Sequence, residues 1–258
     1  MTDRLQGKVA LVTGGSRGIG RGIALRLAQD GCDTVAITYR TDRASADDTA
    51  HRLEELGAKA VVLQSTLEEP ASIPGLFDAL DQELERVAGA RGIDILVNVA
   101  GLGAQESLES MDQDTYDKIM AINARAPFFV TQAAATRLRD GGRVVNISSV
   151  YSRRPTVSNP VYSMAKAALN VLTEVMAAHL GPRGITVNTV APSWTATEAN
   201  APAREAATDY VAGFAQGNVA HRMAEPADVA GVVAMLVGDD GAWLTGQYVD
   251  ADGRWPTD

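Results

Sequence analysis

Short runs of β-branched and apolar residues alternate with longer segments of helical periodicity along almost the whole chain. The strand-like runs are residues 9–13, 34–38, 60–63, 93–98, 143–147, 186–190 and 247–249. Between them, apolar residues recur at helical spacing in segments that include residues 19–30, 44–57, 115–138, 161–180 and 227–237. Strands that alternate with helices are typical of a parallel sheet covered by helices on both faces. The sequence therefore predicts an α/β fold with a doubly wound parallel sheet of about seven strands.

The 258 residues contain no Pro/Gly/Ser-rich linker, internal repeat or low-complexity tract. We therefore expect one domain that spans residues 1–258. The longest interruption of the rhythm covers residues 193–225 and includes three aromatic side chains suited to a binding wall, Trp194, Tyr210 and Phe214. Ligands of open parallel sheets bind beyond the carboxyl ends of the strands, and long loops there are usually functional. This segment is thus predicted to form a substrate lid.

Charge and composition argue against several classes of partner. The formal net charge of −9 disfavours a nucleic-acid surface, which needs clustered Lys and Arg. No apolar run approaches the roughly 18 residues of a membrane span, and the first residues form no apolar signal region. Cys32 is the lone cysteine, and His51, His179 and His221 lack metal-ligand spacing. We therefore expect a cytoplasmic protein with no nucleic-acid, membrane or metal partner.

The first predicted strand runs directly into a glycine-rich turn, Thr13-Gly14-Gly15-Ser16-Arg17-Gly18-Ile19-Gly20, and then into a helix. At such a junction backbone N–H groups and the positive end of the helix dipole meet, which suits a pyrophosphate. Glycine permits the close approach of ligand and helix that a Cβ would block. The strict Gly-x-Gly-x-x-Gly spacing is absent, so an ordinary strand-to-helix turn stays an alternative on this feature alone.

Tyr162 and Lys166 lie four residues apart near the start of the predicted helix 161–180, so they share one face of it. The pKa of an ordinary tyrosine is about 10, and a neighbouring ammonium lowers it toward the range useful for proton transfer. By itself this spacing is common in solvated surface pairs. Ser149 follows the predicted strand 143–147 and so lies at the ligand-binding end of the sheet, with the adjacent Ser148 as the alternative.

Thr-Gly-x-x-x-Gly-x-Gly at the first turn resembles the cofactor motif of the short-chain dehydrogenase/reductase family. Further matches follow in the family's order along almost the whole chain, namely Asn98-Val99-Ala100-Gly101, Asn123, Ser149, Tyr162-x-x-x-Lys166 and residues 188–197. Within the family the chain resembles the 3-oxoacyl-carrier-protein reductases and the ketoreductases of secondary metabolism. The resemblance implies a Rossmann-like single domain, an NAD(P)-dependent oxidoreductase, and a homotetramer or dimer.

The resemblance also implies catalytic roles. Ser149 and Tyr162 would hold the carbonyl oxygen, which becomes negative as hydride reaches the carbon. Tyr162 would transfer the proton, and Lys166 would lower the tyrosine pKa and hold the cofactor ribose. Asn123 would anchor a water that connects the lysine to solvent.

The second predicted strand ends Thr38-Tyr39-Arg40, with no carboxylate to hold a ribose 2′-OH. The resemblance aligns Tyr39 with the Asp of NAD-preferring members. It therefore implies NADP(H) in preference to NAD(H), with Arg17 and Arg40 beside the 2′-phosphate. Thr66 stands where the family has an Asp that meets the adenine amino group. The cofactor-binding residues implied by the family motifs are Gly14, Ser16, Arg17, Gly18, Ile19, Gly20, Tyr39, Arg40, Thr66, Asn98, Ala100, Gly101, Tyr162, Lys166, Pro192, Thr195 and Thr197.

On the substrate side, the implied contacts come from Ser149, Tyr151, Tyr162 and Trp194. The substrate would be a small-molecule ketone or an acyl thioester. An acyl carrier protein is a further candidate partner, because four arginines form local positive spots, although solvated surface charge is the alternative. These arginines are Arg137, Arg139, Arg153 and Arg154.

The chain departs from the family pattern at three places. Val99 replaces the second asparagine of the fourth-strand motif, and Ser193 replaces the glycine after Pro192. Arg254 stands where a second glycine often follows Gly253. None of these departures touches the predicted acid/base residues.

The sequence thus predicts NADPH-dependent reduction of a β-ketoacyl or polyketide-like ketone to a secondary alcohol, with Tyr162 as the proton donor. A sugar or polyol dehydrogenase with the same catalytic residues is one alternative. A non-catalytic nucleotide-sensing regulator is another, since a fold does not establish a function.

Overall fold

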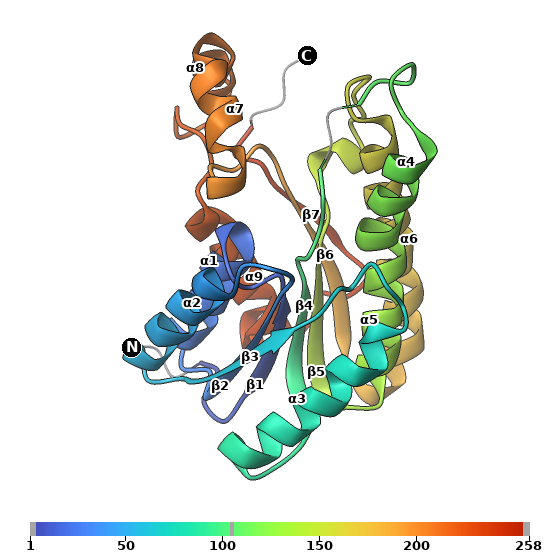
Figure 1. Ribbon diagram of the computed structural model, residues 1–258. Helices are drawn as coiled ribbons and strands as arrows, with labels where there is room; N and C mark the ends of the chain where they lie inside the picture. Colours follow the sequence, from blue (N-terminus) through green and yellow to red (C-terminus); the bar gives the residue numbers. More distant parts are fainter. Residues whose placement is uncertain (1–3, 104–105, 255–258) are drawn as a thin grey trace.

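The computed structural model describes residues 4–103 and 106–254, and one continuous sheet runs through it (Figure 1). The strands are β1 (Val9–Thr13), β2 (Thr34–Tyr39), β3 (Lys59–Gln64), β4 (Ile93–Asn98), β5 (Leu138–Ile147), β6 (Thr186–Pro192) and β7 (Tyr248–Ala251). The α-helices are α1 (Gly18–Gln29), α2 (Arg43–Glu55), α3 (Ser72–Ala88), α4 (Gln113–Met120), α5 (Ala126–Ala135), α6 (Pro160–Leu180), α7 (Ala201–Ala206), α8 (Thr208–Gln216) and α9 (Pro226–Val237). A π-helix, η1 (Ala121–Arg125), separates α4 from α5, and a 3-10 turn, η2 (Val150–Ser152), follows β5.

The seven strands pair in parallel, in the order β3-β2-β1-β4-β5-β6-β7. Strands β2 and β3 therefore follow on one side of β1, and the chain then crosses to the other side of β1, where β4 to β7 follow in order. Open parallel sheets bind ligands in the crevice beyond the strand ends at such a switch point. Thr13 of β1 pairs with Asn98 of β4 at that end, so the loops after both strands leave the sheet side by side.

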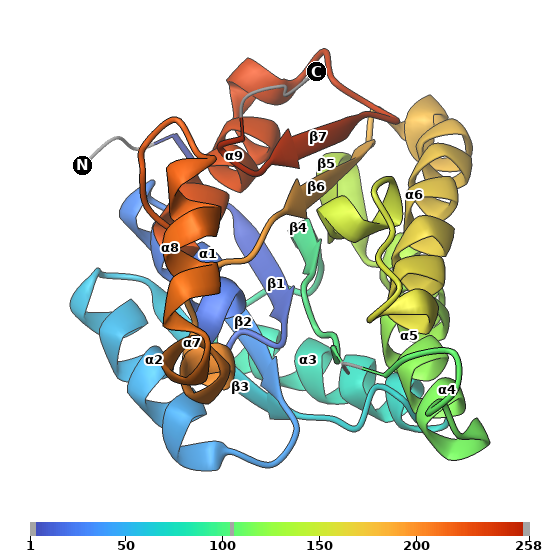
Figure 2. The ribbon, with the colours of Figure 1, turned by 90° about the horizontal axis from the view of Figure 1, so that it is seen from above.

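Helices cover both faces of the sheet, as the strand–helix alternation predicts. Every residue of β1, β2, β4 and β6 is buried, as expected for strands of a parallel sheet that is covered on both faces. Helices α1, α2 and α9 pack on one face and α3, α5 and α6 on the other (Figures 1 and 2). Successive β1 side chains alternate between the two cores, with Ala10 and Val12 in the first and Val9 and Leu11 in the second.

The predicted helix 115–138 is wrong in its extent, because α4, η1 and α5 divide the segment and Leu138 already belongs to β5. Leu138 is buried and pairs with Ile93 of the neighbouring strand. That partner lies far along the chain, so helical periodicity alone could not reveal the strand. Helix α3, which the predicted segments did not include, covers the sheet through buried residues such as Phe77.

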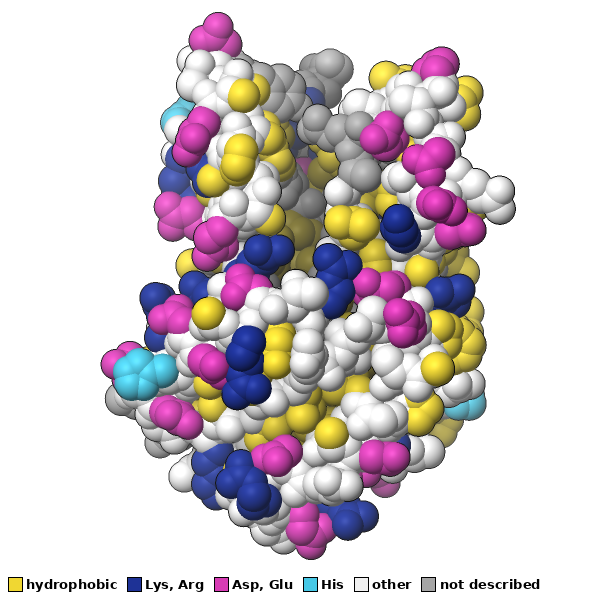
Figure 3. All heavy atoms as spheres, in the orientation of Figure 1, with side chains coloured by type: hydrophobic (Ala, Val, Ile, Leu, Met, Phe, Trp, Pro, Cys, Tyr) yellow, Lys and Arg dark blue, Asp and Glu magenta, His cyan; other side chains and the backbone are white. Residues whose placement is uncertain are grey.

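The segment 193–225 contains α7 and α8, which stand above the carboxyl ends of the strands (Figure 1). Figure 3 shows a hollow between the lobe that carries α7 and α8 and the lobe at the top of α4, with hydrophobic side chains on its walls. The hollow opens at the same end of the sheet as the switch point. Within residues 4–103 and 106–254, no helix is long and apolar enough to cross a membrane.

Candidate active site

The glycine turn after β1 is too tight for side chains at its motif positions. A Cβ on Gly20 would lie 2.1 Å from the Gly14 carbonyl oxygen, and one on Gly14 would lie 3.0 Å from the Cα of Ala100. Gly14 and Gly18 also adopt left-handed φ values of +65° and +55°, which glycine tolerates best. The turn thereby brings the N-terminus of α1, preceded by the extended and exposed Arg17, to the carboxyl end of the sheet.

A carboxylate from the predicted lid binds this turn. The Gly18 N–H donates to Glu198 Oε2 at 3.1 Å, and Arg21 Nη1 lies 3.6 Å from Glu198 Oε1. Sequence reasoning missed Glu198, although an acidic residue directly after Thr197 was the available signal. The contact demonstrates that the first turn of α1 accepts an anionic group. Together with a turn that a Cβ would obstruct, it fits the diphosphate of a dinucleotide.

The loop after β4 is fastened to the glycine turn. Thr13 Oγ1 accepts the N–H groups of Val99 at 3.0 Å and Ala100 at 3.2 Å. Val99 packs against the core, so its apolar side chain suits the position where the family has asparagine. The Asn98 amide points into the protein, where it donates to Thr131 Oγ1 at 3.0 Å and Asn146 Oδ1 at 2.8 Å. A cofactor contact from Asn98 would therefore have to come from its backbone.

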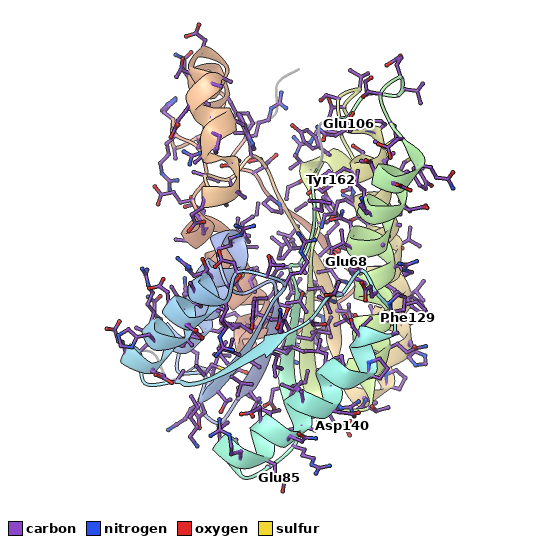
Figure 4. The ribbon with its side chains drawn as sticks, in the orientation of Figure 1. Glu68, Glu85, Glu106, Phe129, Asp140 and Tyr162 are labelled. Carbon is purple, nitrogen blue, oxygen red and sulfur yellow. The ribbon has the colours of Figure 1, made fainter. Side chains whose placement is uncertain are left out.

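The residues predicted for the adenosine half lie at the carboxyl ends of β2 and β3. Tyr39 ends β2 and is buried, whereas Arg40 is exposed and donates from Nη1 to Glu68 Oε1 at 2.9 Å. Figure 4 shows Glu68 on the segment that follows β3. Thr66 is half-buried on the same segment, and its carbonyl oxygen accepts from Ser72 Oγ at 2.8 Å. Glu68, which sequence reasoning missed, therefore holds the cation predicted to select the cofactor.

Ser149, Tyr162 and Lys166 come together beyond the carboxyl end of β5. The Ser149 side chain lies close enough to the Tyr162 hydroxyl to lower its pKa. Lys166 Nζ donates to the Ile147 carbonyl oxygen at 2.9 Å and lies 5.7 Å from the centroid of the Tyr162 ring. A Cβ on Gly101 would lie 3.4 Å from the same Nζ, so the loop after β4 borders this group. Figure 4 shows Tyr162 above the strand ends, far from Glu85 and Asp140 at the opposite end.

The neighbouring Ser148 has a different role. Its Oγ donates to the main-chain carbonyl of Lys166 at 3.1 Å, and its side chain is buried. Ser148 therefore packs β5 against α6, and Ser149 is the serine that meets Tyr162.

Burial controls the ionisation of both reactive groups. It raises the pKa of Tyr162 to about 12, an effect that the neighbouring Ser149 side chain partly offsets. Burial also lowers the pKa of Lys166 to about 8. Burial thus acts against the lowering of the tyrosine pKa that the resemblance implies for Lys166, and in the protein by itself it has the largest influence on the pKa of Tyr162. At neutral pH Tyr162 stays protonated and Lys166 stays mostly charged.

Asn123 lies in the π-helix η1 and is completely buried. Its Nδ2 donates to the carbonyl oxygens of Ile119 at 2.9 Å and Leu102 at 2.8 Å, and its Oδ1 accepts the Leu102 N–H at 3.3 Å. A Cβ on Gly101 would lie 2.7 Å from that Oδ1. Asn123 thus fixes the loop that borders Lys166, and π-turns inside helices often mark functional positions.

The other predicted substrate residues come from two separate segments, the predicted lid and the turn η2 after β5. Trp194 and Phe214 meet edge to face, with ring centroids 6.2 Å apart. Tyr151 is half-buried in η2, and its N–H donates to Ser149 Oγ at 3.2 Å. The Tyr210 side chain lies outside the described part of the structure.

The segment after Pro192, the last residue of β6, returns toward the glycine turn. Thr195 is buried and donates from Oγ1 to the Ser193 carbonyl oxygen at 3.0 Å. Thr197 lies nearer to the glycine turn: if Gly18 carried a Cβ, that atom would lie 3.2 Å from Thr197 Cγ2. Of the two threonines, Thr197 is therefore the better placed for a cofactor contact.

The four arginines proposed as positive spots are all engaged with neighbouring side chains. Arg137 and Arg139 flank the first residue of β5, at the opposite end of the sheet, and pair with Asp81 and Asp94. Arg154 pairs with Asp250 and Asp252, and the Arg153 guanidinium lies 3.7 Å from the centroid of the Tyr248 ring. Among the described residues no three His, Cys, Asp or Glu side chains are arranged to hold a metal ion.

Known proteins resemble this chain over nearly its whole length. A family model described as enoyl-(acyl carrier protein) reductase matches residues 14–253. An uncharacterised oxidoreductase of Methylorubrum extorquens is 37% identical over 251 residues, which cover 97% of this chain and 98% of the relative.

Two solved ketoreductases share both sequence and fold with the chain. The angucycline C-6 ketoreductase LanV with bound NADP has a TM-score of 0.92 and 38% identity, covering 98% of this chain and 97% of LanV. LanV has also been solved with NADP and rabelomycin. The promiscuous reductase LugOII, which catalyses keto-reduction at C1 during lugdunomycin biosynthesis, has a TM-score of 0.92 and 40% identity, covering 97% of this chain and 98% of LugOII.

Proposed function

The chain belongs to the short-chain dehydrogenase/reductase family, and we propose that it reduces a ketone to a secondary alcohol with NADPH as the hydride donor. The observation that carries this proposal is the pairing of Tyr162 with Ser149 beside Lys166. The pair lies at the end of the sheet where the glycine turn of β1 also opens. A proton donor and a nucleotide site thus share one crevice.

We infer NADP(H) rather than NAD(H) from the end of β2. Arg40 offers a guanidinium, which suits a 2′-phosphate, and Tyr39 leaves no carboxylate for a ribose 2′-OH. The nearby Asp42 accepts from the N–H of Ser45 at 3.0 Å and from its Oγ at 2.7 Å. The Asp42 carboxylate therefore caps α2, and both of its oxygens already accept hydrogen bonds from Ser45. LanV, solved with NADP, supports the same choice.

The reaction needs a hydride and a proton. When bound, the nicotinamide supplies the hydride to the carbonyl carbon. Tyr162 donates a hydrogen bond and then its proton to the carbonyl oxygen, which Ser149 also holds, so both groups stabilise the charge that develops there. The Lys166 ammonium stabilises the phenolate left on Tyr162 until solvent returns a proton.

Protonation favours the reductive direction at neutral pH. Because burial raises the pKa of Tyr162 to about 12, the phenol is the dominant form and can act as an acid. Alcohol oxidation would need the phenolate as a base, a form that is scarce at pH 7. Reduction is therefore the direction that we propose.

We propose a polyketide-like aromatic ketone, free of a carrier protein, as the substrate. Trp194 and Phe214 offer aromatic surface on the predicted lid, and Tyr151 offers it on the turn that contacts Ser149; such surface suits a planar ring system better than a sugar. Because Arg137, Arg139, Arg153 and Arg154 are engaged with neighbouring side chains, these four arginines are not free to receive an acidic carrier protein. This choice is supported by LanV, which has been solved with bound rabelomycin, and by LugOII, which catalyses keto-reduction at C1 during lugdunomycin biosynthesis.

The test is NADPH oxidation with a panel of three ketone classes: rabelomycin as an angucyclinone, a β-ketoacyl thioester and a ketose. Turnover should be fastest with the angucyclinone. Tyr162→Phe should lower kcat by about 10²-fold or more, in line with the loss of a general acid, and leave NADPH affinity intact. Tyr116→Phe on the exposed face of α4 is the matched control and should behave as the wild type.

Full activity of Tyr162→Phe would refute the mechanism. Turnover of the ketose alone would replace the ketoreductase with a sugar dehydrogenase. NADPH binding without turnover of any ketone would favour a nucleotide sensor.

A further inference from the structure

The main-chain carbonyl of Ser149 receives an unusual concentration of donors. It accepts the Ser152 N–H at 3.0 Å, the Ser152 hydroxyl at 2.7 Å and the Tyr248 hydroxyl at 3.3 Å. The N–H bond belongs to the 3-10 turn η2. The two hydroxyl bonds are additional, and unlike the N–H bond they depend on the identity of the side chains at positions 152 and 248. The peptide that follows Ser149 is therefore held from two directions.

The Ser152 hydroxyl is in turn held by the helix that carries the proton donor. Asn170 Nδ2 donates to Ser152 Oγ at 2.9 Å. Asn170 follows Lys166 by four residues and Tyr162 by eight, so all three share one face of α6. A path of two hydrogen bonds, from Asn170 through Ser152 to the Ser149 carbonyl, thus ties Ser149 to that face.

Keeping an amide at position 170 costs stability. Within the described residues, Asn170 Oδ1 is buried without a hydrogen-bond partner. A leucine of similar size would avoid the desolvation of that oxygen. The amide therefore makes sense through the hydrogen bond that its Nδ2 donates to Ser152 Oγ.

Tyr248 is fixed independently of α6. It is the first residue of β7, its hydroxyl also lies 3.3 Å from Ser152 Oγ, and the Arg153 guanidinium stacks on its ring at 3.7 Å. Arg154 ties the same turn to β7 through Asp250 at 3.3 Å. The edge strand of the sheet thus braces η2 against α6.

We propose that Ser152, held by Asn170 and braced by Tyr248, is a positioning residue that sets the Ser149 hydroxyl relative to the Tyr162 hydroxyl. The inference rests on the proposed ketoreductase function. Ser149 has an extended backbone, with φ of −160° and ψ of 152°, and its Oγ accepts the Tyr151 N–H at 3.2 Å within the turn. The direction of the Ser149 side chain therefore depends on how its following peptide is held.

The first measurement compares kcat and NADPH affinity between the Ser152→Ala variant and the wild type. Removal of one donor to the oxyanion typically costs about 10² to 10³ in kcat, so misplacing such a donor should cost less, about tenfold. NADPH affinity, measured by fluorescence titration, should not change, because Ser152 lies on the substrate side. Asn170→Leu should lower kcat in the same way while the midpoint of thermal unfolding stays level or rises. Tyr248→Phe keeps the ring under Arg153 and should lower kcat by about twofold, with Tyr116→Phe as its control.

The decisive measurement is a double-mutant cycle with Ser149→Ala. If Ser152 acts through Ser149, adding Ser152→Ala to Ser149→Ala should cause no further loss of kcat. A tenfold loss in both backgrounds would show a merely structural role and overturn the proposal, as would wild-type kcat in Ser152→Ala alone. If Ser149→Ala and Tyr162→Phe were themselves fully active, the proposed function would fail instead, so the two failures are distinguishable.

Discussion

Lys166→Met tests the prediction that the buried charge of Lys166 lowers the free energy of unfolding of the protein. Its side chain is buried, and burial lowers its pKa from 10.5 to about 8. At 1.36 kcal/mol per pKa unit, the charged form is disfavoured in the folded chain by about 3 kcal/mol. Methionine removes that charge but also removes the donor to the Ile147 carbonyl, a loss of about 1 kcal/mol. We expect Lys166→Met to be more stable than the wild type by about 2 kcal/mol at pH 7.

The pH dependence of the free energy of unfolding separates the penalty of the buried charge from the loss of the hydrogen bond to the Ile147 carbonyl. Between pH 8 and 10.5 the unfolded wild type still binds the lysine proton and the folded wild type does not, so wild-type stability rises with pH in this window. Below pH 8 the penalty is fully present, and above 10.5 it is gone. The lost hydrogen bond does not depend on pH. The advantage of Lys166→Met should therefore shrink by about 3 kcal/mol from pH 7.5 to pH 10.5 and end slightly negative.

The assay is urea unfolding without nucleotide, at one protein concentration, for both proteins at pH 7.5, 9 and 10.5. Lys59→Met, at an exposed position on β3, is the control and should show a much smaller change with pH. Activity of Lys166→Met should fall steeply at every pH. Parallel stability profiles for the wild type and Lys166→Met across this range would refute the assignment of a buried, charged lysine.

Three further predictions concern binding. Arg40→Ser removes the charged donor for a 2′-phosphate and should weaken NADPH binding by about tenfold to a hundredfold while leaving NADH binding unchanged, as measured by calorimetry; equal losses for both nucleotides would contradict it. Gly20→Ala places a Cβ 2.1 Å from the Gly14 carbonyl oxygen and should weaken NADPH binding at least about tenfold, whereas Gly75→Ala in α3 meets no atom within 4 Å and should raise stability by up to about 1 kcal/mol with unchanged affinity. Trp194→Ala should raise KM for an angucyclinone by about tenfold with little change in kcat for a small aliphatic ketone; an unchanged KM would remove Trp194 from the substrate wall.

Several features of the site could be predicted because they depend on short stretches of sequence. The glycine turn is a local junction of strand and helix, and the Tyr162 and Lys166 spacing fixes a shared helix face whatever surrounds it. Other contacts join residues that are far apart in the sequence. Glu198 reaches the glycine turn from the predicted lid, and Glu68 reaches Arg40 from the segment after β3. No periodicity or motif connects the members of such pairs.

The amino-acid sequence by itself determined the strand–helix alternation, and with it the parallel sheet, its ligand-binding end and the residues available there. Only the tertiary structure decided that residues 115–138 divide into two α-helices, the π-helix between them and the start of β5, because Leu138 finds its partner on β4. It also decided the ionisation of the site. Burial raises the pKa of Tyr162, opposite to the direction expected from its lysine neighbour, because desolvation depends on the atoms packed around a group. Spacing along a helix specifies which side chains can come together, whereas tertiary packing specifies how far water is excluded from them and hence their pKa values.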